Sequence, residues 1–329
     1  MSESEKNNAV SAPMIEVRRL KKYFKVKNSW LHAVDNIQLK IANGKTLGVV
    51  GESGCGKSTL GRTILRLIEP TSGEIYFKGN DITKLSKEQM RQKRMEMQII
   101  FQDPYASLNP RLSVSEIIAE PMIVNKTFGT RREIEDHVDF LMDTVGLSAR
   151  VYNAYPHELD GGRRQRIGIA RALAVNPSFI VCDEPVSALD VSIQAQILNL
   201  LKSLQMKIGL TYMFITHDLS VVKHISDEIA VLYLGQCVEM ANSKELFANP
   251  MHPYTKALLS AIPVPDLSTR TQKIQIIRGE VTSPINPQPG CRFAVRCEFC
   301  QADCAGSDPE FLEVSPGHFV ACRHYNMVK

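Results

Sequence analysis

Glycines, a lysine and a serine at a fixed spacing lie between residues 46 and 60 of the sequence. Gly51 is separated by four residues from Gly56, and Lys57 and Ser58 follow directly. Glycines let backbone amides close around phosphates, the lysine neutralises the terminal phosphates, and the serine hydroxyl ligates Mg²⁺. The spacing therefore predicts that the chain binds a nucleoside triphosphate with Mg²⁺. The expected contact residues are Gly51, Glu52, Ser53, Gly54, Cys55, Gly56, Lys57, Ser58 and Thr59.

Two acidic residues follow a second apolar stretch, Phe179–Cys182. Asp183 is placed to hold Mg²⁺, and Glu184 is placed to polarise the water that attacks the terminal phosphate. A solvated strand end is the alternative interpretation of this acidic pair. Because a phosphate-binding loop lies upstream, the nucleotide-site interpretation is favoured.

These side chains must be positioned by strands and helices. Thr46–Val50, before the loop, is apolar and predicts a buried strand, and helical periodicity begins after the loop at Leu60. Alternating strands and helices indicate an α/β fold with a mostly parallel sheet that is covered on both faces. Residues 14–45 predict short strands and turns. Further predicted strands are Glu74–Phe77, Gln98–Phe101, Phe179–Cys182, Tyr212–Ile215 and Ile229–Leu234.

Two helical regions complete this picture. From Pro104 to about Pro156 the chain has helical periodicity without a strand pattern, which predicts a helical subdomain over about residues 104–165. A second helix supplies a crossover between strands. Its inward face is predicted to be Ile193, Ile197, Leu200, Leu201 and Leu204.

The amino-acid composition restricts which classes of protein this chain can belong to. The 329 residues are 44% hydrophobic and 22% charged, which is ordinary for a soluble globular chain. The net charge of +4 makes no case for a nucleic-acid partner. No apolar run reaches the 18 or more residues of a membrane span, and residues 1–13 predict a disordered tail rather than a signal peptide.

Four further motifs, in order along residues 14 to about 240, resemble those of the ATP-binding subunits of ATP-binding-cassette (ABC) transporters. The resemblance implies a P-loop NTPase fold of the ABC-ATPase type, with an antiparallel N-terminal β part and an α-helical subdomain. The motifs are Phe101–Gln102–Asp103–Pro104, Leu159–Asp160–Gly161–Gly162–Arg163, Ser187–Ala188–Leu189–Asp190 and Thr216–His217–Asp218.

The resemblance also implies roles for single residues. Glu184 would be the catalytic base, His217 would contact the γ-phosphate, and Gln102 would join Mg²⁺ and water to the helical subdomain. The Mg²⁺ ligands would be Ser58, Gln102 and Asp183. Phe24, or Tyr23 in its place, would stack on adenine, although a strand aromatic in the core is the alternative for either ring.

The signature motif departs from the family pattern. The family has Leu-Ser-Gly-Gly-Gln, whereas this chain has Asp160 for the serine and Arg163 for the glutamine. In the family, each of two ATP molecules lies between one chain's phosphate loop and the other chain's signature, and Asp190 crosses the dimer. A carboxylate ~4 Å from a phosphate charge is repelled by ~4 kcal/mol at an effective dielectric of ~20.

Two interpretations of this departure stay open. In one, Asp160 caps its helix and pairs with Arg163, which makes it a tolerated variant. In the other, the chain pairs with a different ATPase subunit that carries an intact signature. The site built on Lys57 is then competent, and the site facing Asp160, Gly161 and Gly162 is impaired.

The residues after about 240 narrow the subfamily. Asn249–Leu259 is similar to a segment of the ATPase subunits of oligopeptide and dipeptide importers, so residues 241–329 are interpreted as their C-terminal extension. This implies two transmembrane permease subunits, an extracytoplasmic binding protein, and a location on the cytoplasmic face of the cell membrane. The cargo stays open among peptides, nickel and glutathione. A cassette ATPase without a membrane partner and a clamp that binds ATP without turnover are the other classes.

Five of the eight cysteines lie between Cys291 and Cys322. Four thiolates can hold either Zn²⁺ or an iron–sulfur cluster. Zinc ribbons favour two Cys-x-x-Cys pairs, and here Cys297 and Cys300 alone have that spacing. The subfamily resemblance implies a [4Fe–4S] cluster on Cys291, Cys297, Cys304 and Cys322, with zinc and uncoordinated thiols as alternatives.

Overall fold

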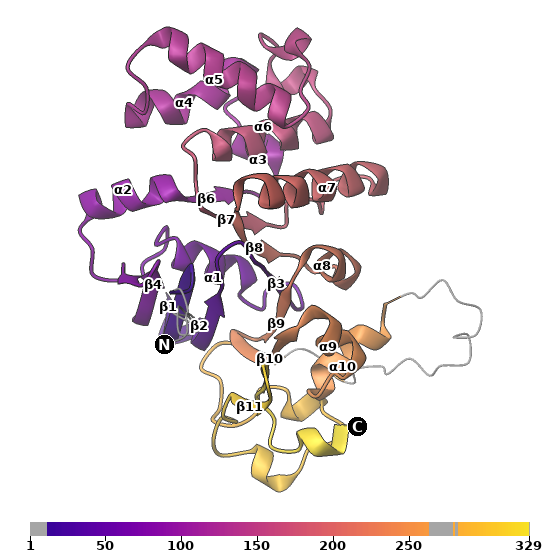
Figure 1. Ribbon diagram of the computed structural model, residues 1–329. Coiled ribbons are helices and arrows are strands. Elements are labelled where there is room, and N and C mark those ends of the chain that lie inside the picture. The colour runs from indigo at the N-terminus through magenta and orange to yellow at the C-terminus, as the bar shows by residue number, and fades with distance from the viewer. Residues whose placement is uncertain (1–11, 263–278, 280–281, 329) are drawn as a thin grey trace, which may run out of the picture.

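The apolar strand before the phosphate loop lies in the middle of a mixed sheet (Figure 1). The computed structural model describes residues 12–262, 279 and 282–328. Most of the tail predicted over residues 1–13 therefore lies outside the described residues. Within the described part, the order of this sheet is β11-β12-β10-β9-β3-β8-β7-β6. The strands are β3 (Thr46–Val50), β6 (Met97–Ile100), β7 (Phe179–Asp183), β8 (Thr211–Ile215), β9 (Glu228–Tyr233), β10 (Gln236–Asn242), β11 (Leu312–Ser315) and β12 (His318–Val320).

The central strands of this sheet run parallel, as predicted. β3 pairs with β8 and β9, and β7 pairs with β6 and β8, all in parallel register. Helix α7 (Val191–Ile208) connects β7 to β8, α8 (Leu219–Ile225) connects β8 to β9, and α1 (Lys57–Ile64) follows β3. Because parallel strands end at the same edge, the residues after β3, β6, β7 and β8 gather there.

Alternate side chains of the central strands enter two different cores, as a sheet covered on both faces requires. Val181 and Ile215 pack with Leu60 of α1 toward the N-terminal sheet. Ile180 and Phe214 pack on the opposite face, in a cluster that includes α7. The predicted inward face of α7 is largely confirmed, since Ile197, Leu201 and Leu204 are buried while Ile193 and Leu200 are partly buried.

The strands of a second sheet come from the residues before and after the phosphate loop in the sequence. Its order is β2-β1-β4-β5, and all its pairs are antiparallel. The strands are β1 (Ile15–Val26), β2 (Ser29–Ile41), β4 (Ser72–Phe77) and β5 (Asn80–Asp81).

The prediction of short strands and turns over residues 14–45 was wrong. β1 has 12 residues and β2 has 13, and they form one long hairpin. Register shifts interrupt their pairing between Val17 and Tyr23. Such bulges break the alternation of buried and exposed positions, and this break imitates a series of short strands in the sequence.

The helical subdomain lies at one end of the molecule, beyond the β6 edge of the sheet (Figure 1). It contains no strand among the described residues, as predicted. Its elements are α3 (Pro104–Ser107), α4 (Val114–Asn125), α5 (Arg131–Thr144), η2 (Ala149–Val151), η3 (Pro156–Glu158) and α6 (Gly161–Leu173). Helix α2 (Lys87–Glu96) precedes β6.

The C-terminal residues lie at the opposite end and are joined to the core sheet. β12 pairs antiparallel with β10, and β11 pairs with β12. The buried pair His318 and Glu239, with Nε2 and Oε1 2.8 Å apart, also joins the two strands. The remaining elements are α9 (Ser243–Ala248), α10 (Pro253–Ser260), η5 (Ala294–Arg296), η6 (Ala302–Cys304) and η7 (Tyr325–Val328).

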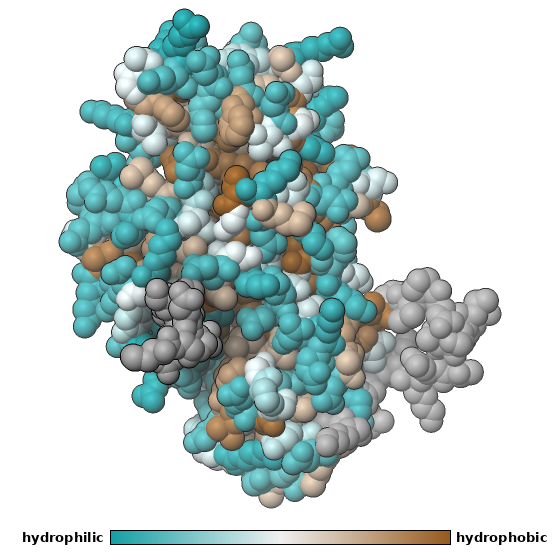
Figure 2. Space-filling view, viewed as in Figure 1, coloured by the Kyte–Doolittle hydropathy of each residue, from teal (hydrophilic) through white to brown (hydrophobic). Residues whose placement is uncertain are grey.

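The face drawn in Figure 2 is mostly hydrophilic, and its hydrophobic side chains form small separate groups. Among the described residues, none of the helices has the length and apolar character needed to cross a membrane.

Candidate nucleotide-binding site

The residues predicted to bind nucleotide come together at the carboxyl edge of the core sheet. Most of them line one cavity of about 510 Å³ that opens to solvent, whereas Gly51, Glu52 and Asp183 are absent from its lining. Sequence reasoning missed the walls contributed by β2 and by Leu234, Gly235 and Pro284, because these segments carry no recognisable motif. The predicted residues in the lining are Phe24, Ser53, Gly54, Cys55, Gly56, Lys57, Ser58, Thr59, Gln102, Glu184 and His217.

The loop between β3 and α1 requires glycine at two positions. Gly56 has φ +103°, and a Cβ there would lie 2.0 Å from the Ala33 carbonyl oxygen. A Cβ at Gly51 would lie 2.2 Å from the Leu232 carbonyl oxygen. The loop therefore holds its tight curve only without side chains at these positions.

The Lys57 side chain is buried and reaches back to the start of the phosphate loop. Its Nζ donates hydrogen bonds to the carbonyl oxygens of Gly51 at 2.8 Å and Glu52 at 2.9 Å. The ammonium group is thus held inside the loop, where it would meet phosphate oxygens.

Two of the three residues predicted to bind Mg²⁺, Ser58 and Asp183, are in contact with each other, whereas the third, Gln102, contacts Glu184. The Ser58 hydroxyl donates to Asp183 Oδ1 at 2.6 Å, and Asp183 is buried at the end of β7. Hydroxyl and carboxylate oxygens are the ligands that Mg²⁺ prefers, so these residues fit the ion. Arg62 Nη2 lies 3.2 Å from Asp183 Oδ2, and sequence reasoning missed this contact. The sequence signal that could have predicted this contact is the position of Arg62 one helical turn after Ser58.

Three predicted catalytic residues meet at one carboxylate oxygen. Gln102 Nε2 donates to Glu184 Oε2 at 2.9 Å, and His217 Nδ1 lies 3.2 Å from the same oxygen. They follow β6, β7 and β8, so three neighbouring strand ends bring them together. Glu184 has φ +49°, a strained value for a residue with a side chain, and such strain is typical of functional sites.

The structure separates the two candidate adenine-stacking rings, Phe24 and Tyr23. Phe24 lines the nucleotide cavity. Tyr23 instead stacks on His32 with ring centroids 3.8 Å apart, and its hydroxyl donates to Asp35. Burial raises the pKa of Asp35, but hydrogen bonds from Tyr23 and His32 and the charge of Arg292 hold that pKa below its usual value. Tyr23 therefore belongs to a polar network beside the cavity.

The signature residues are absent from the lining of this chain's own nucleotide cavity. Asp160 is the N-cap of α6, and its Oδ1 accepts from the Arg163 backbone N–H at 2.8 Å. Its other oxygen lies 3.5 Å from Arg163 Nη1, with both side chains more than half exposed. Asp190 caps α7, and a Cβ added to Gly162 would clash with Ile193 of that helix. The residues after Asp160 thus pack against those around Asp190, and both aspartates are exposed.

The four cysteines predicted to bind a cluster lie near one another. The Cys291 backbone N–H donates to the Cys304 carbonyl oxygen at 2.8 Å. Burial raises the pKa of the Cys291 thiol to about 12, and the nearby Cys322, Cys304 and Cys297 thiols add to this shift. Burial also raises the pKa of Cys297 to about 11, whereas Cys300 is exposed.

A tighter group of possible metal ligands also occurs in this region. In the described residues, the group whose ligand atoms all lie within 4.8 Å of one another is Asp303, Cys304 and His324. Sequence reasoning missed this group because its members are spread along the chain and form no spaced motif. No three of the four predicted cysteines approach one another that closely within the described structure.

Comparisons with known proteins agree with this geometry. Residues 34–187 match the family described as ABC transporter, and residues 238–304 match the oligopeptide/dipeptide transporter C-terminal region. The chain is 51% identical over 316 residues to a Bacillus subtilis protein named putative oligopeptide transport ATP-binding protein YkfD, covering 95% of this chain and 96% of that protein. The chain belongs to the ABC transporter family.

Other relatives extend the comparison of this ABC protein. It is 50% identical to the oligopeptide transport ATP-binding protein AppF of Bacillus subtilis, over 95% of this chain and 98% of AppF. It is 49% identical to OppF of Haemophilus influenzae, over 94% of this chain and 96% of OppF. A solved dimer of the ATP-binding cassette MJ0796 with ADP and Pi is 30% identical, with a TM-score of 0.65, and covers 70% of this chain and 99% of that one. The ABC-ATPase fold is therefore confirmed.

Proposed function

We propose that this ABC ATPase energises an importer for oligopeptides or dipeptides. One observation carries the ATPase assignment: Gln102 and His217 both contact the Glu184 carboxylate, beside the phosphate loop. The match of residues 238–304 to the oligopeptide/dipeptide transporter C-terminal region supports the class of cargo. The chain would work on the cytoplasmic face of the cell membrane, with two permease subunits and an extracytoplasmic binding protein.

The site residues would divide the chemistry of hydrolysis between them. Lys57 would exchange the carbonyl oxygens of Gly51 and Glu52 for phosphate oxygens. Ser58 and Asp183 would hold Mg²⁺, which supplies positive charge to the phosphates. Glu184 would accept a proton from the attacking water, while His217 would donate a hydrogen bond to the γ-phosphate.

The helical subdomain is the surface we assign to the permease subunits. Apolar side chains of α4 and α5 are exposed there, with Ile123 59%, Val124 67% and Phe140 62% accessible. Exposed apolar groups of this kind favour burial against a partner. Because Gln102 lies between this subdomain and Glu184, closure of the nucleotide site would move the permease contact.

Purification of the tagged chain from native membranes tests this assignment directly. We expect two membrane-spanning subunits and a second ATPase chain to copurify, and we expect ATP turnover by the complex to increase with peptide-loaded binding protein. A complex that turns over ATP but responds to nickel or glutathione, and not to peptides, would contradict the peptide assignment.

We also assign this chain to an asymmetric pair of ATPase subunits. Asp160 in place of the family serine supports this, because a carboxylate there repels a phosphate from the partner's loop. The site built on Lys57 would be the working one. Separate substitution of the loop lysine in each chain tests the assignment, since Lys57→Ala should abolish transport while the partner's change should be tolerated. The reverse pattern would contradict it.

The cysteine region would hold a [4Fe–4S] cluster on Cys291, Cys297, Cys304 and Cys322. The thiols of Cys297, Cys304 and Cys322 all raise the pKa of Cys291, which supports a common site. No three of these four sulfur atoms in the described structure lie within 4.8 Å of one another, which favours a cluster over one zinc ion. Sulfurs around one tetrahedral zinc lie only ~3.8 Å apart, given Zn–S bonds of ~2.3 Å. A bound cluster would stabilise the fold of this region. Absorption near 400 nm with about four irons per chain is expected after anaerobic purification; stoichiometric zinc would contradict the proposal.

A further inference from the structure

Glu52, the second residue of the phosphate loop, is held from outside the loop by two residues of the C-terminal extension. The Tyr254 hydroxyl of α10 accepts a hydrogen bond from the Glu52 backbone N–H at 2.9 Å. The Arg296 guanidinium of η5 contacts both carboxylate oxygens, at 3.0 Å to Oε2 and 3.1 Å to Oε1. Backbone and side chain of one loop residue are therefore both fixed by residues more than 200 positions away in the chain.

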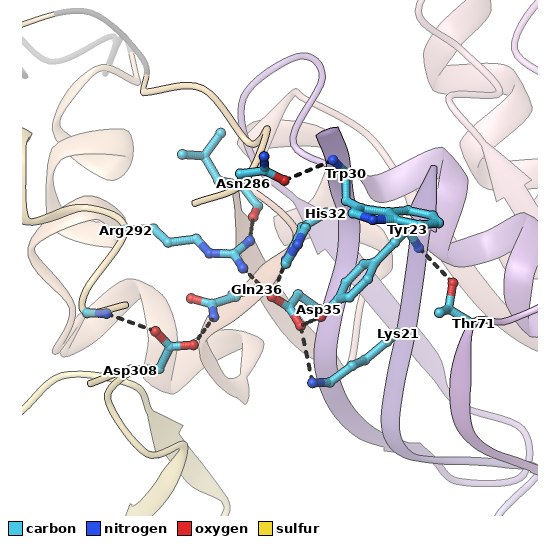
Figure 3. Close-up of polar contacts among 12 residues, drawn as sticks. Lys21, Tyr23, Trp30, His32, Asp35, Thr71, Gln236, Asn286, Arg292 and Asp308 are labelled. Atoms are coloured by element: carbon cyan, nitrogen blue, oxygen red, sulfur yellow. Dashed lines mark hydrogen bonds and ion pairs between the residues drawn. The ribbon is translucent and has the colours of Figure 1, made fainter. Parts of the chain in front are cut away.

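The residues that hold Glu52 are themselves buried. Tyr254 is fully buried, and the Arg296 side chain is 7% exposed. Arg296 Nη1 also donates to the Tyr233 hydroxyl at 3.2 Å, and Tyr233 ends β9 of the core sheet. The neighbouring Arg292 anchors the same segment through Asp35 and the Leu234 carbonyl oxygen (Figure 3). A two-pronged ion pair in such surroundings is weakly screened by solvent.

The ion pair decides where the Glu52 carboxylate lies. Glu52 is absent from the lining of the nucleotide cavity but lines a smaller adjacent cavity with Tyr233 and Pro284. Its carbonyl oxygen, in contrast, accepts from Lys57 inside the loop. A carboxylate released from Arg296 would therefore lie on the loop that receives the phosphates, and would repel them.

We propose that Arg296 and Tyr254 are positioning residues of the phosphate loop: Arg296 holds the Glu52 carboxylate away from the bound nucleotide, and Tyr254 fixes the Glu52 backbone. The C-terminal extension thereby takes part in ATP binding, in addition to any role as a separate cluster-binding unit. This inference rests on the proposed ATP binding at the same loop.

A charge-removal experiment in the full chain tests the proposal. Arg296→Ala should raise the Kd for MgATP about tenfold, because it frees a like charge beside the phosphates. The double variant Arg296→Ala with Glu52→Gln should regain most of that affinity, because the freed side chain is no longer charged. The loss in Arg296→Ala should also be larger for MgATP than for MgADP, which carries less negative charge.

The matched control is Arg323→Ala in the same extension. Like Arg296, which precedes Cys297, Arg323 is adjacent in sequence to a cysteine, Cys322. Its guanidinium, however, contacts Asp303 and Ser307 and not the phosphate loop. The Kd for MgATP of this control should be that of the unaltered chain. Thermal unfolding of each variant establishes that the measured chain is folded.

Two outcomes would overturn the proposal: unchanged MgATP affinity in folded Arg296→Ala, or a loss that Glu52→Gln fails to restore in a folded double variant. Failure of the proposed function looks different. In that case the unaltered chain would bind MgATP no better than Lys57→Ala, and no variant of Arg296 would change the result.

Discussion

We assign hydrolysis, as distinct from binding, to Glu184. Its carboxylate receives contacts from Gln102 and His217, while we assign the phosphate and metal contacts to Lys57, Ser58 and Asp183. Chemistry and binding therefore use different side chains of the same cavity. Substitutions can separate the two.

We expect Glu184→Gln to lower ATP turnover about 10²- to 10⁴-fold, because the amide cannot accept a proton from the attacking water. MgATP binding should persist, since the phosphate and metal contacts are intact. Turnover of the assembled complex and equilibrium binding of MgATP measure the two effects. Glu88→Gln, on the exposed face of α2, is the control and should change neither. Equal loss of binding and turnover would contradict the assigned role.

Phe24 and Tyr23 adjoin in the sequence but should respond differently to substitution. Phe24→Ala should weaken MgATP binding by ~1 kcal/mol, the scale of one aromatic stacking contact. Tyr23→Phe removes the hydroxyl that donates to Asp35 and should lower the free energy of unfolding by ~1 kcal/mol without changing MgATP affinity. Nucleotide titration and denaturant unfolding of both variants measure these effects. If Tyr23→Phe weakened nucleotide binding and Phe24→Ala did not, the assignment of Phe24 as the adenine-stacking ring would be wrong.

At the scale of elements, helix termini and strand ends do most of the positioning. α1 begins at Lys57 directly after the loop, and α6 begins after Asp160. α10 begins after His252, whose Nδ1 accepts from the Tyr254 backbone N–H at 3.1 Å. Since Tyr254 in turn contacts Glu52, the start of α10 connects the stability of the extension to the phosphate loop.

His252 gives this element a pH dependence. Burial lowers its pKa to about 4 in the folded chain, against the ordinary value of 6.5. As pH falls below 6.5, the unfolded chain therefore takes up a proton first, and the free energy of unfolding should fall by ~3 kcal/mol by pH 4. His252→Asn keeps an acceptor for Tyr254 and should remove this part of the pH dependence. Chemical denaturation of both proteins from pH 7 to 4 measures the free energy of unfolding at each pH. An equal dependence of this free energy on pH in the unaltered chain and in His252→Asn would contradict the prediction.

At the scale of the whole molecule, we propose that one chain holds an incomplete catalytic unit. The Lys57 cavity contains none of the signature residues Asp160, Gly161 and Gly162 of the same chain. The related cassette with ADP and Pi was solved as a dimer. In this proposal a second chain would bring its signature to the Lys57 cavity, and Asp160 of this chain would face the partner's loop.

Restoring the family serine tests the consequence of Asp160. In a complex with Lys57→Ala, remaining turnover comes from the site that faces Asp160, and Asp160→Ser should raise it about tenfold or more by removing a like charge. The helix cap should persist, since serine also caps well. Asp143→Ser, on the exposed face of α5, is the control. Unchanged turnover would favour the alternative in which the Asp160–Arg163 pair is tolerated.

Local spacing made much of the site predictable. The loop, the acidic pair at the end of β7, Gln102 and His217 all lie at strand ends as predicted, because buried strands leave a plain apolar signal. The long β1–β2 hairpin was missed because its bulges break that signal. Contacts such as Arg62 to Asp183 were missed because ion pairs leave no periodic pattern.

The sequence alone determined the ligand, the fold class and the family, because phosphate binding and buried strands constrain residue types over short spans. The tertiary structure decided which aromatic ring enters the cavity and that Asp160 caps its own helix. It also decided that the C-terminal extension adds strands to the core sheet and contacts Glu52 through Tyr254 and Arg296. These features depend on packing between segments far apart in the chain, and no short stretch of residues encodes such packing.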